Sequence, residues 1–217
     1  MATEPRTRLA RADRMEQTLN AAHDLFAERG YAAVKMDEIA AAVGVTKPLL
    51  YNYFGNKERL YITVMERAGD SLTATVAEAV GDSANPGEAL GAGVRAFFSF
   101  LDSDRAAWAV LFDETLPHGG EVADRVAEYR RHICELVAGS MLAQLPAERR
   151  DAARIEIEAL STALLGAAEA LARWWLRTEE ISAEDAAELL IATIEPGLRA
   201  RSTPTTSLTP EKGTSTK

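Results

Sequence analysis

Residues 36–60 read MDEIAAAVGVTKPLLYNYFGNKERL, and their pattern sets the expectation for the whole chain. The first part places Met36, Ile39 and Val43 at helical spacing, and Gly44 follows them as a helix stop. The second part predicts another short helix, which the next glycine ends. Two short helices joined by a glycine turn are the arrangement of a helix-turn-helix motif, in which the segment after Gly44 would be the recognition helix.

One side of the predicted recognition helix is apolar, because Leu50 and Phe54, four residues apart, point inward on a helical wheel. The opposite side and its borders suit DNA: lysine and asparagine can bond base edges or phosphates, and tyrosine hydroxyls can hold phosphates. The residues there are Lys47, Pro48, Leu49, Tyr51, Asn52 and, near an edge, Tyr53. Any one of them could instead complete a small core, but the set at this spacing favours DNA.

The flanking residues predict further helices. Leu19 and Phe26 belong to an apolar stripe before Gly30, which acts as a stop. Thr46 can cap the recognition helix, and Asn56 can cap the long helix that follows it. Lys57 lies in the first turn of that long helix, where the helix dipole also favours a phosphate.

The remainder of the chain predicts helices only, so we expect an all-α fold of about nine helices. The segment GDSANPG (81–87) is a predicted linker between helices. Further apolar stripes follow it, and the last predicted helix begins at a Ser182–Asp185 capping box. Pro196 and Gly197 should kink or end that last helix. We predict a DNA-binding domain over 1–56 with a basic N-terminal arm (Arg6, Arg8, Arg11, Arg14), a second helical domain over 57–201, and a disordered tail over 202–217.

Charge is distributed unevenly along this acidic chain, which has 33 acidic and 24 basic residues among 217. Residues 1–60 hold nine basic and eight acidic side chains, whereas residues 61–217 hold fifteen and twenty-five. We call residues 1–60 the head. A near-neutral head in an otherwise acidic chain is expected if only the head contacts a polyanion. The single cysteine suits a reducing cytoplasm, and no apolar run of about 18 residues predicts a membrane span.

The segments LFAERGY (25–31) and MDEIAAAVGVTKPLLYNYFGNKERLY (36–61) resemble the N-terminal signature of the TetR family of bacterial transcriptional regulators, over roughly residues 10–66. The resemblance implies a homodimeric, repressor-type protein whose first three helices bind operator DNA and whose later helices bind an inducer and dimerise. It thus implies that the second domain, over 57–201, is a ligand-binding and dimerisation domain. By position, it assigns Thr46, Lys47, Leu49, Asn52 and Tyr53 to the DNA-facing helix and Tyr51 and Lys57 to phosphates. Lys35 departs from the family's Ser or Thr cap, and a lysine there could pair with a phosphate directly.

Beyond residue 80 the resemblance is architectural, and it implies a small apolar or amphipathic effector. FFSFLD (97–102) followed by AVLFDE (109–114) loosely resembles family members that sense lipids or acyl-CoA, so fatty acids, acyl-CoAs and lipophilic drugs are the expected classes. An apolar stripe at helical spacing is more often plain core, and both interpretations stay open. The candidate pocket aromatics are Phe97, Phe98, Phe100, Trp108, Phe112, Tyr129, Trp174 and Trp175.

The last two long helices predict the homodimer interface, because they carry apolar surface enough for a four-helix contact. The residues concerned are Leu164, Leu165, Leu171, Leu189, Leu190 and Ile194, which could instead pack within one subunit.

An enzyme is a weaker hypothesis: the sequence has no phosphate-cradling loop, metal-ligand pair or nucleophile–histidine arrangement, and we expect no catalytic residue, metal or cofactor. A helical adaptor with residues 149–200 as its interaction bundle would leave the Lys/Tyr/Asn face unexplained.

Overall fold

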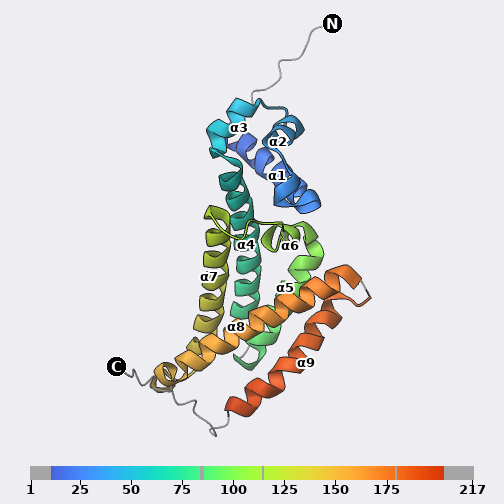
Figure 1. Cartoon of the computed structure of the whole chain (residues 1–217). Helices are drawn as coiled ribbons and strands as arrows, with labels where there is room; N and C mark the ends of the chain where they lie inside the picture. Colours follow the sequence, from blue (N-terminus) through green and yellow to red (C-terminus); the bar gives the residue numbers. More distant parts are fainter. Residues whose placement is uncertain (1–10, 84–85, 114, 179, 203–217) are drawn as a thin grey trace, which may run out of the picture. The chain divides into compact units, whose positions relative to one another are not determined.

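The computed structural model describes residues 11–83, 86–113, 115–178 and 180–202, and within these ranges the chain forms nine α-helices and no strand (Figure 1). The helices are α1 (Arg11–Ala33), α2 (Met36–Ala42), α3 (Lys47–Phe54), α4 (Lys57–Gly81), α5 (Pro86–Ser103), α6 (Arg105–Leu111), α7 (Glu121–Ala143), α8 (Ala147–Thr178) and α9 (Ala183–Ser202). The predicted all-α class is confirmed for this part of the chain. Arg6, Arg8 and the predicted tail beyond Ser202 lie outside the described residues.

Three glycines form the predicted breaks in the first three helices. Gly44, between α2 and α3, has a φ of +66°, and Gly55, after α3, has a φ of +79°. Both values lie in the left-handed region, which glycine adopts without steric strain. Gly30 has a φ of 73° and interrupts α1, whose last turn ends at Ala33.

Two of the three predicted helix caps are confirmed. The backbone N–H of Arg59 donates to Asn56 Oδ1 (2.7 Å), and that of Asp185 donates to Ser182 Oγ (3.0 Å) at the start of α9. Thr46 occupies the N-cap position of α3, but among the described residues its side chain makes no capping hydrogen bond. Its backbone carbonyl instead accepts from the N–H groups of Leu49 and Leu50, so the helix begins there without the hydroxyl.

The expectation that Pro196 and Gly197 would end the last helix is wrong, because α9 continues to Ser202 with Pro196 inside it. A proline removes one hydrogen bond to the carbonyl four residues earlier, here that of Ala192. Both Pro196 and Ala192 are exposed, so water can satisfy that carbonyl. A kink at Pro196 stays a prediction.

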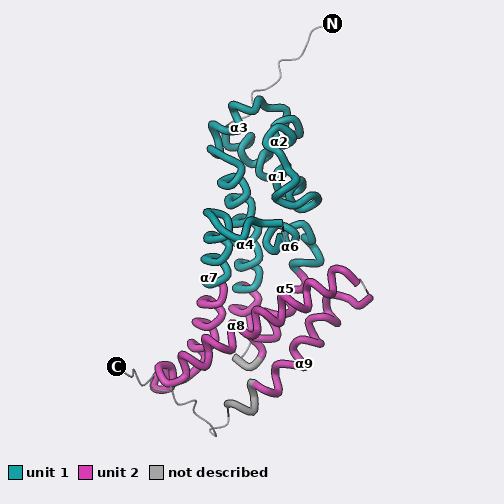
Figure 2. The backbone as a smooth tube through the Cα atoms, viewed as in Figure 1, with its two compact units in different colours: residues 1–77, 100–131 teal, residues 78–99, 132–217 magenta. Residues whose placement is uncertain are grey.

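Contacts divide the chain into two compact units (Figure 2). The first unit contains Met1–Ala77 and Phe100–Arg131, and the second contains Glu78–Ser99 and His132–Lys217. Helices α4, α5 and α7 each contribute residues to both units, so the predicted domain limits at residues 56 and 201 are not tested by this division and stay predictions.

An aromatic cluster forms much of the core of the first unit. Phe26 and Tyr31 of α1 lie with Tyr61 of α4, and the Tyr61 ring centroid is 5.0 Å from each of the other two. The Tyr61 hydroxyl donates to the carbonyl of Val110 in α6 (2.5 Å), and burial raises the pKa of Tyr61. The helices α1, α4 and α6 therefore share one core, and α1 also packs directly on α6.

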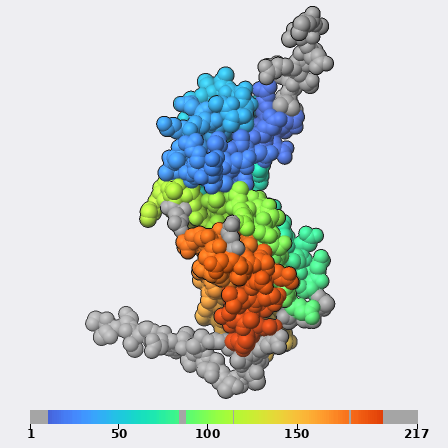
Figure 3. Space-filling model, turned by 90° about the vertical axis from the view of Figure 1, so that its right-hand side faces the viewer, coloured from blue at the N-terminus to red at the C-terminus, as the bar shows by residue number. Residues whose placement is uncertain are grey.

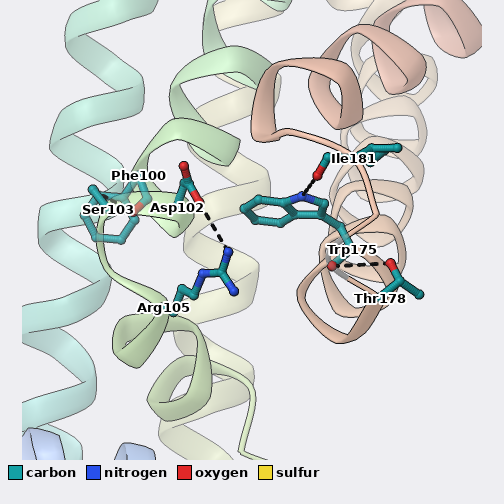
Figure 4. Close-up of polar contacts among 7 residues, drawn as sticks. All are labelled: Phe100, Asp102, Ser103, Arg105, Trp175, Thr178 and Ile181. Carbon is teal, nitrogen blue, oxygen red and sulfur yellow. Dashed lines mark hydrogen bonds and ion pairs between the residues drawn. The ribbon is translucent and has the colours of Figure 1, made fainter.

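The second unit has its own aromatic and alanine-rich core. Phe98 of α5 lies edge-on to Phe97 (5.2 Å between centroids) and to Trp175 of α8 (5.8 Å). The Trp175 indole N–H donates to the carbonyl of Ile181 (2.9 Å), which links α8 to a residue just before α9 (Figure 4). Helices α8 and α9 run side by side, and Figure 3 shows α9 and the adjoining part of α8 on one face. No helix of the described ranges is both long and apolar enough to span a membrane.

Candidate nucleic-acid interface

Helices α2 and α3 form the helix-turn-helix motif, and each of them buries apolar side chains. Met36 and Ile39 of α2 are buried, and so are Leu50 and Phe54 of α3, as the helical wheel predicted. Gly44 supplies the turn between the two helices without a side chain nearby to obstruct it. The inward side of α3 is thereby fixed, and its other side faces outward.

Most of the remaining predicted DNA-binding residues belong to α3 or to its N-cap, whereas Lys35 precedes α2 and Lys57 begins α4. Tyr51 keeps 40% of its surface exposed. A phenol at such a position contributes little to the core and leaves its hydroxyl available to a phosphate. The exposed residues are Lys35, Thr46, Lys47, Tyr51 and Asn52, and the half-buried ones are Leu49, Tyr53 and Lys57.

Lys47 is held by a carboxylate of the preceding helix. Its ammonium lies 2.9 Å from Asp37 Oδ1 and 3.0 Å from Asp37 Oδ2. The hydrogen bond to Asp37 raises the pKa of Lys47. Both side chains are largely exposed, so a DNA phosphate would compete with Asp37 for the same ammonium.

Lys57 has a different environment from the one that the sequence suggests. Its Nζ lies 4.3 Å from the ring centroid of Tyr31, the geometry of a cation–π contact. Burial lowers the pKa of Lys57, and the nearby carboxylates of Asp113 and Glu38 act in the opposite direction. Lys57 therefore packs against the end of α1 as well as lying in the first turn of α4.

Lys35 occupies the N-cap position of α2, where a lysine cannot accept a hydrogen bond. Its backbone N–H donates to Glu38 Oε2 (2.8 Å), and Glu38 also pairs with Arg29 (2.9 Å). These two interactions, the backbone N–H first, lower the pKa of Glu38. Glu38 thus supplies one half of a capping box, and the Lys35 ammonium remains exposed on the surface of the head.

An open groove of about 720 Å³ borders the C-terminal end of α3. Tyr51, Asn52 and Tyr53 form its wall on the recognition helix. Its other lining residues are Met15, Phe54, Gly55, Arg59, Ile62, Thr63, Glu66, Glu121 and Arg125. Sequence reasoning missed Arg59, although its position three residues after the Asn56 cap placed it on the same first turn as Lys57.

The candidate ligand-binding aromatics have different environments within the two units. Phe97, Phe98 and Trp175 form the buried cluster of the second unit, whereas Trp174 is 39% exposed on α8. In the first unit Trp108 and Phe112 stack on each other with centroids 4.0 Å apart. Phe100 is buried in the same unit, where its carbonyl accepts from Ser103 Oγ (Figure 4).

Tyr129, the last of these aromatics, lies on Gly69 of α4, and its hydroxyl is 3.1 Å from Thr73 Oγ1. This contact joins α7 to α4 and gives Tyr129 a packing role. Among the described residues there is also no group of three or more His, Cys, Asp or Glu side chains placed to hold a metal ion.

Comparison with known proteins reveals relatives over both parts of the chain. The family model for bacterial regulatory proteins of the tetR family matches residues 19–64, and the model for the tetracyclin repressor-like C-terminal domain matches residues 86–195. The chain is similar to the HTH-type transcriptional activator FasR of Mycolicibacterium smegmatis, with 39% identity over 119 residues, 55% of this chain and 54% of that protein. The chain spans about half the length of the first curated relatives that it matches.

Solved structures extend the similarity to nearly full length. A TetR-like transcriptional regulator from Rhodococcus sp. RHA1 is 32% identical with a TM-score of 0.71, and the match covers 88% of this chain and 99% of that one. AibR, solved in complex with isovaleryl coenzyme A and operator DNA, is 25% identical with a TM-score of 0.66, covering 84% of this chain and 98% of that one.

Proposed function

Because the chain belongs to the TetR family of bacterial regulatory proteins, which are transcriptional regulators and not enzymes, we propose that it is a ligand-responsive repressor that binds operator DNA as a homodimer. The observation that carries the DNA-binding part is the division of α3: Leu50 and Phe54 are buried, while Tyr51 and Asn52 are exposed beside Lys47. A regulator that binds chromosomal DNA acts in the cytoplasm.

Selection of duplexes from a random library, followed by titration of the selected and a shuffled duplex, tests this proposal. If two heads neutralise about six to ten phosphates, affinity should fall on the order of a thousandfold or more between about 50 and 200 mM salt. Asn52→Ala should relax specificity and cost about 1–3 kcal/mol at a preferred base pair, because an amide reads a base edge. Gln144→Ala, an exposed amide outside the head, is the matched control. Failure to enrich any sequence would refute the proposal.

Repression is distinguished from activation by a reporter placed downstream of the selected operator. A bound dimer over a promoter should lower expression, and loss of the protein should raise it. The opposite result would make the protein an activator, the second candidate, which the name of the relative FasR favours.

We propose an acyl-CoA or another amphipathic acyl compound as effector, which the isovaleryl coenzyme A of the relative AibR supports. A path to the head exists within the first unit: Asp113, two residues after α6, accepts a hydrogen bond from the Tyr31 N–H (2.5 Å), and Thr115 accepts one from the Ala32 N–H (3.3 Å). A displacement of α6 would therefore pull on the end of α1.

Titration with isovaleryl-CoA, stearoyl-CoA and free coenzyme A, followed by tryptophan fluorescence and by anisotropy of a labelled operator, tests the effector. A coupling of about 1–3 kcal/mol would change operator affinity roughly 5- to 150-fold. Quenching without a change in operator affinity would show that the compound binds but does not regulate DNA binding. A ligand with equal affinity for the DNA-binding and the released conformation does not change the balance between them.

A further inference from the structure

Two lysines that the sequence assigns to DNA already contact other side chains of residues 1–60. Lys47 pairs with Asp37, and Lys57 lies over the ring of Tyr31. A phosphate must compete with these contacts or share them. A positive charge without such a partner near the C-terminal end of α3 must therefore come from another side chain.

Arg59 is placed to supply that charge. It is exposed, and its Cδ lies 3.7 Å from the position that a methyl group on Gly55 would take, so its stem passes over the residue where α3 ends. Asn56 accepts the backbone N–H of Arg59, so the backbone of Arg59 is fixed in the first turn of α4. In the part of the chain that the structure describes, no ion pair occupies this guanidinium.

A second guanidinium lies at the same end of the recognition helix. The Arg11 Cζ is 5.4 Å from the ring centroid of Tyr53, a cation–π contact that orients Arg11 from the start of α1. Tyr53 is also part of the groove wall that Arg59 lines. Tyr53 therefore contacts Arg11 of α1 and lines the same groove as Arg59 of α4.

The other charged residues that line the groove add no such excess of positive charge. Arg125 pairs with Glu66 and Glu128, and Glu121 adds a further carboxylate to the lining. Arg59 is therefore the cation of the groove lining that is best placed to attract an anion. Tyr51 and Asn52, which are exposed on α3, line the same groove, so DNA on this face of α3 would bring a backbone phosphate to Arg59.

We propose that Arg59 and Arg11 form a phosphate clamp around Tyr53, which holds the DNA backbone beside the recognition helix. The guanidinium group suits this role because its planar fork can bond two phosphate oxygens at once. The clamp rests on the proposed DNA-binding function and adds two residues to it. It positions the helix on the duplex without reading its sequence.

The test compares the full-length protein with Arg59→Gln, Arg11→Gln and Arg125→Gln on a selected operator and on a shuffled duplex between 50 and 200 mM KCl. Each lost phosphate contact should lower the slope of log affinity against log salt by about 0.9, so about 1.8 for a species with two heads. If the two slopes differ by about 1.8, the ratio of wild-type to Arg59→Gln affinity should fall about tenfold as the salt rises from 50 to 200 mM. Arg11→Gln should behave alike, and both should weaken the two duplexes equally.

Arg125→Gln is the matched control, because it removes the same charge from the same groove at an ion-paired position. An equal loss of slope for Arg125→Gln would indicate a general field effect and overturn the clamp, as would an unchanged slope for Arg59→Gln. Arg59→Lys should keep the slope but bind more weakly, since it retains the charge and loses the fork. If the wild type itself binds neither duplex, it is the proposed function that fails.

Discussion

Gly30 is the residue on which the end of α1 depends most directly. Its φ of 73° with a ψ of 162° excludes side chains, and a Cβ there would lie 2.8 Å from Thr115 Oγ1. Gly30→Ala should therefore lower the free energy of unfolding by about 1–3 kcal/mol. The control is Gly139→Ala in α7, where nothing lies within 4 Å and alanine should stabilise the helix by about 0.5–1 kcal/mol. Urea unfolding followed by circular dichroism measures both, and equal changes would contradict the strain at Gly30.

Asp37 limits how far Lys47 can contribute to DNA binding. Asp37→Asn removes the partner of Lys47 and a negative charge from the DNA-facing side, so binding to all sequences should strengthen and the salt slope should steepen by up to about 0.9 per head. Asp151→Asn, an exposed carboxylate on α8, should change neither quantity. Fluorescence anisotropy on a shuffled duplex checks this. A weaker complex for Asp37→Asn would show that the pair positions Lys47 for DNA.

The sequence predicts the sides of α3 correctly because burial follows helical spacing, as Leu50 and Phe54 illustrate. It does not predict the internal partners of the lysines. Lys57 meets Tyr31, 26 positions earlier in the chain, and that contact exists only after α1 and α4 have packed together. The cap at Thr46 fails for a related reason: the residue type allows a bond that the local geometry does not make.

At the scale of helices, α4 and α7 are joined by a close contact that leaves no room for a methyl group. A Cβ on Gly69 would overlap the Tyr129 ring, and the Tyr129 hydroxyl lies 3.1 Å from Thr73 Oγ1. Gly69→Ala should displace Tyr129 and lower the free energy of unfolding by about 1–3 kcal/mol. In the background of Tyr129→Ala the same substitution should cost little, because the overlapping ring is gone. Urea unfolding of the wild type, the two single variants and the double variant measures the coupling between the two substitutions. Additive effects would show that the Gly69–Tyr129 contact is not the cause of the loss of stability.

The helices themselves can be predicted, since glycines, capping residues and apolar stripes mark their limits in the sequence. The sequence does not predict which helices pack against one another. Tyr129 is an aromatic residue in an apolar stripe, and a stripe has the same pattern whether it packs on Gly69 or faces a ligand. The aromatics that the sequence proposed for a ligand accordingly have different partners: Phe98 contacts Trp175, Trp108 contacts Phe112, and Tyr129 contacts Gly69.

At the scale of the molecule, the proposed homodimer depends on which apolar side chains one chain leaves open. Leu190, a member of the predicted interface, is only 5% exposed and so packs within its own chain. Its neighbour Leu189 is 52% exposed on α9, and Trp174 is 39% exposed on α8. Small residues at helical spacing also lie exposed along α8 and would let another helix approach closely: Ala159, Ala163, Gly166 and Ala170.

A second copy of this chain is the partner that DNA recognition favours, because one recognition helix reads only a few base pairs and two-fold symmetry supplies the second half-site. Leu189→Glu should therefore give particles of 23.5 kDa, the mass of one chain, where the wild type gives twice that mass. Leu136→Glu on α7 is the matched control, since Leu136 is 44% exposed but lies outside the proposed α8–α9 interface. Light scattering after size exclusion measures the masses, and circular dichroism verifies that both variants keep their helices. Because two linked heads bind the operator far more tightly than one, Leu189→Glu should also weaken operator binding strongly while leaving binding of a single head to random DNA unchanged. A Leu189→Glu protein that keeps the wild-type mass would place the interface on another surface.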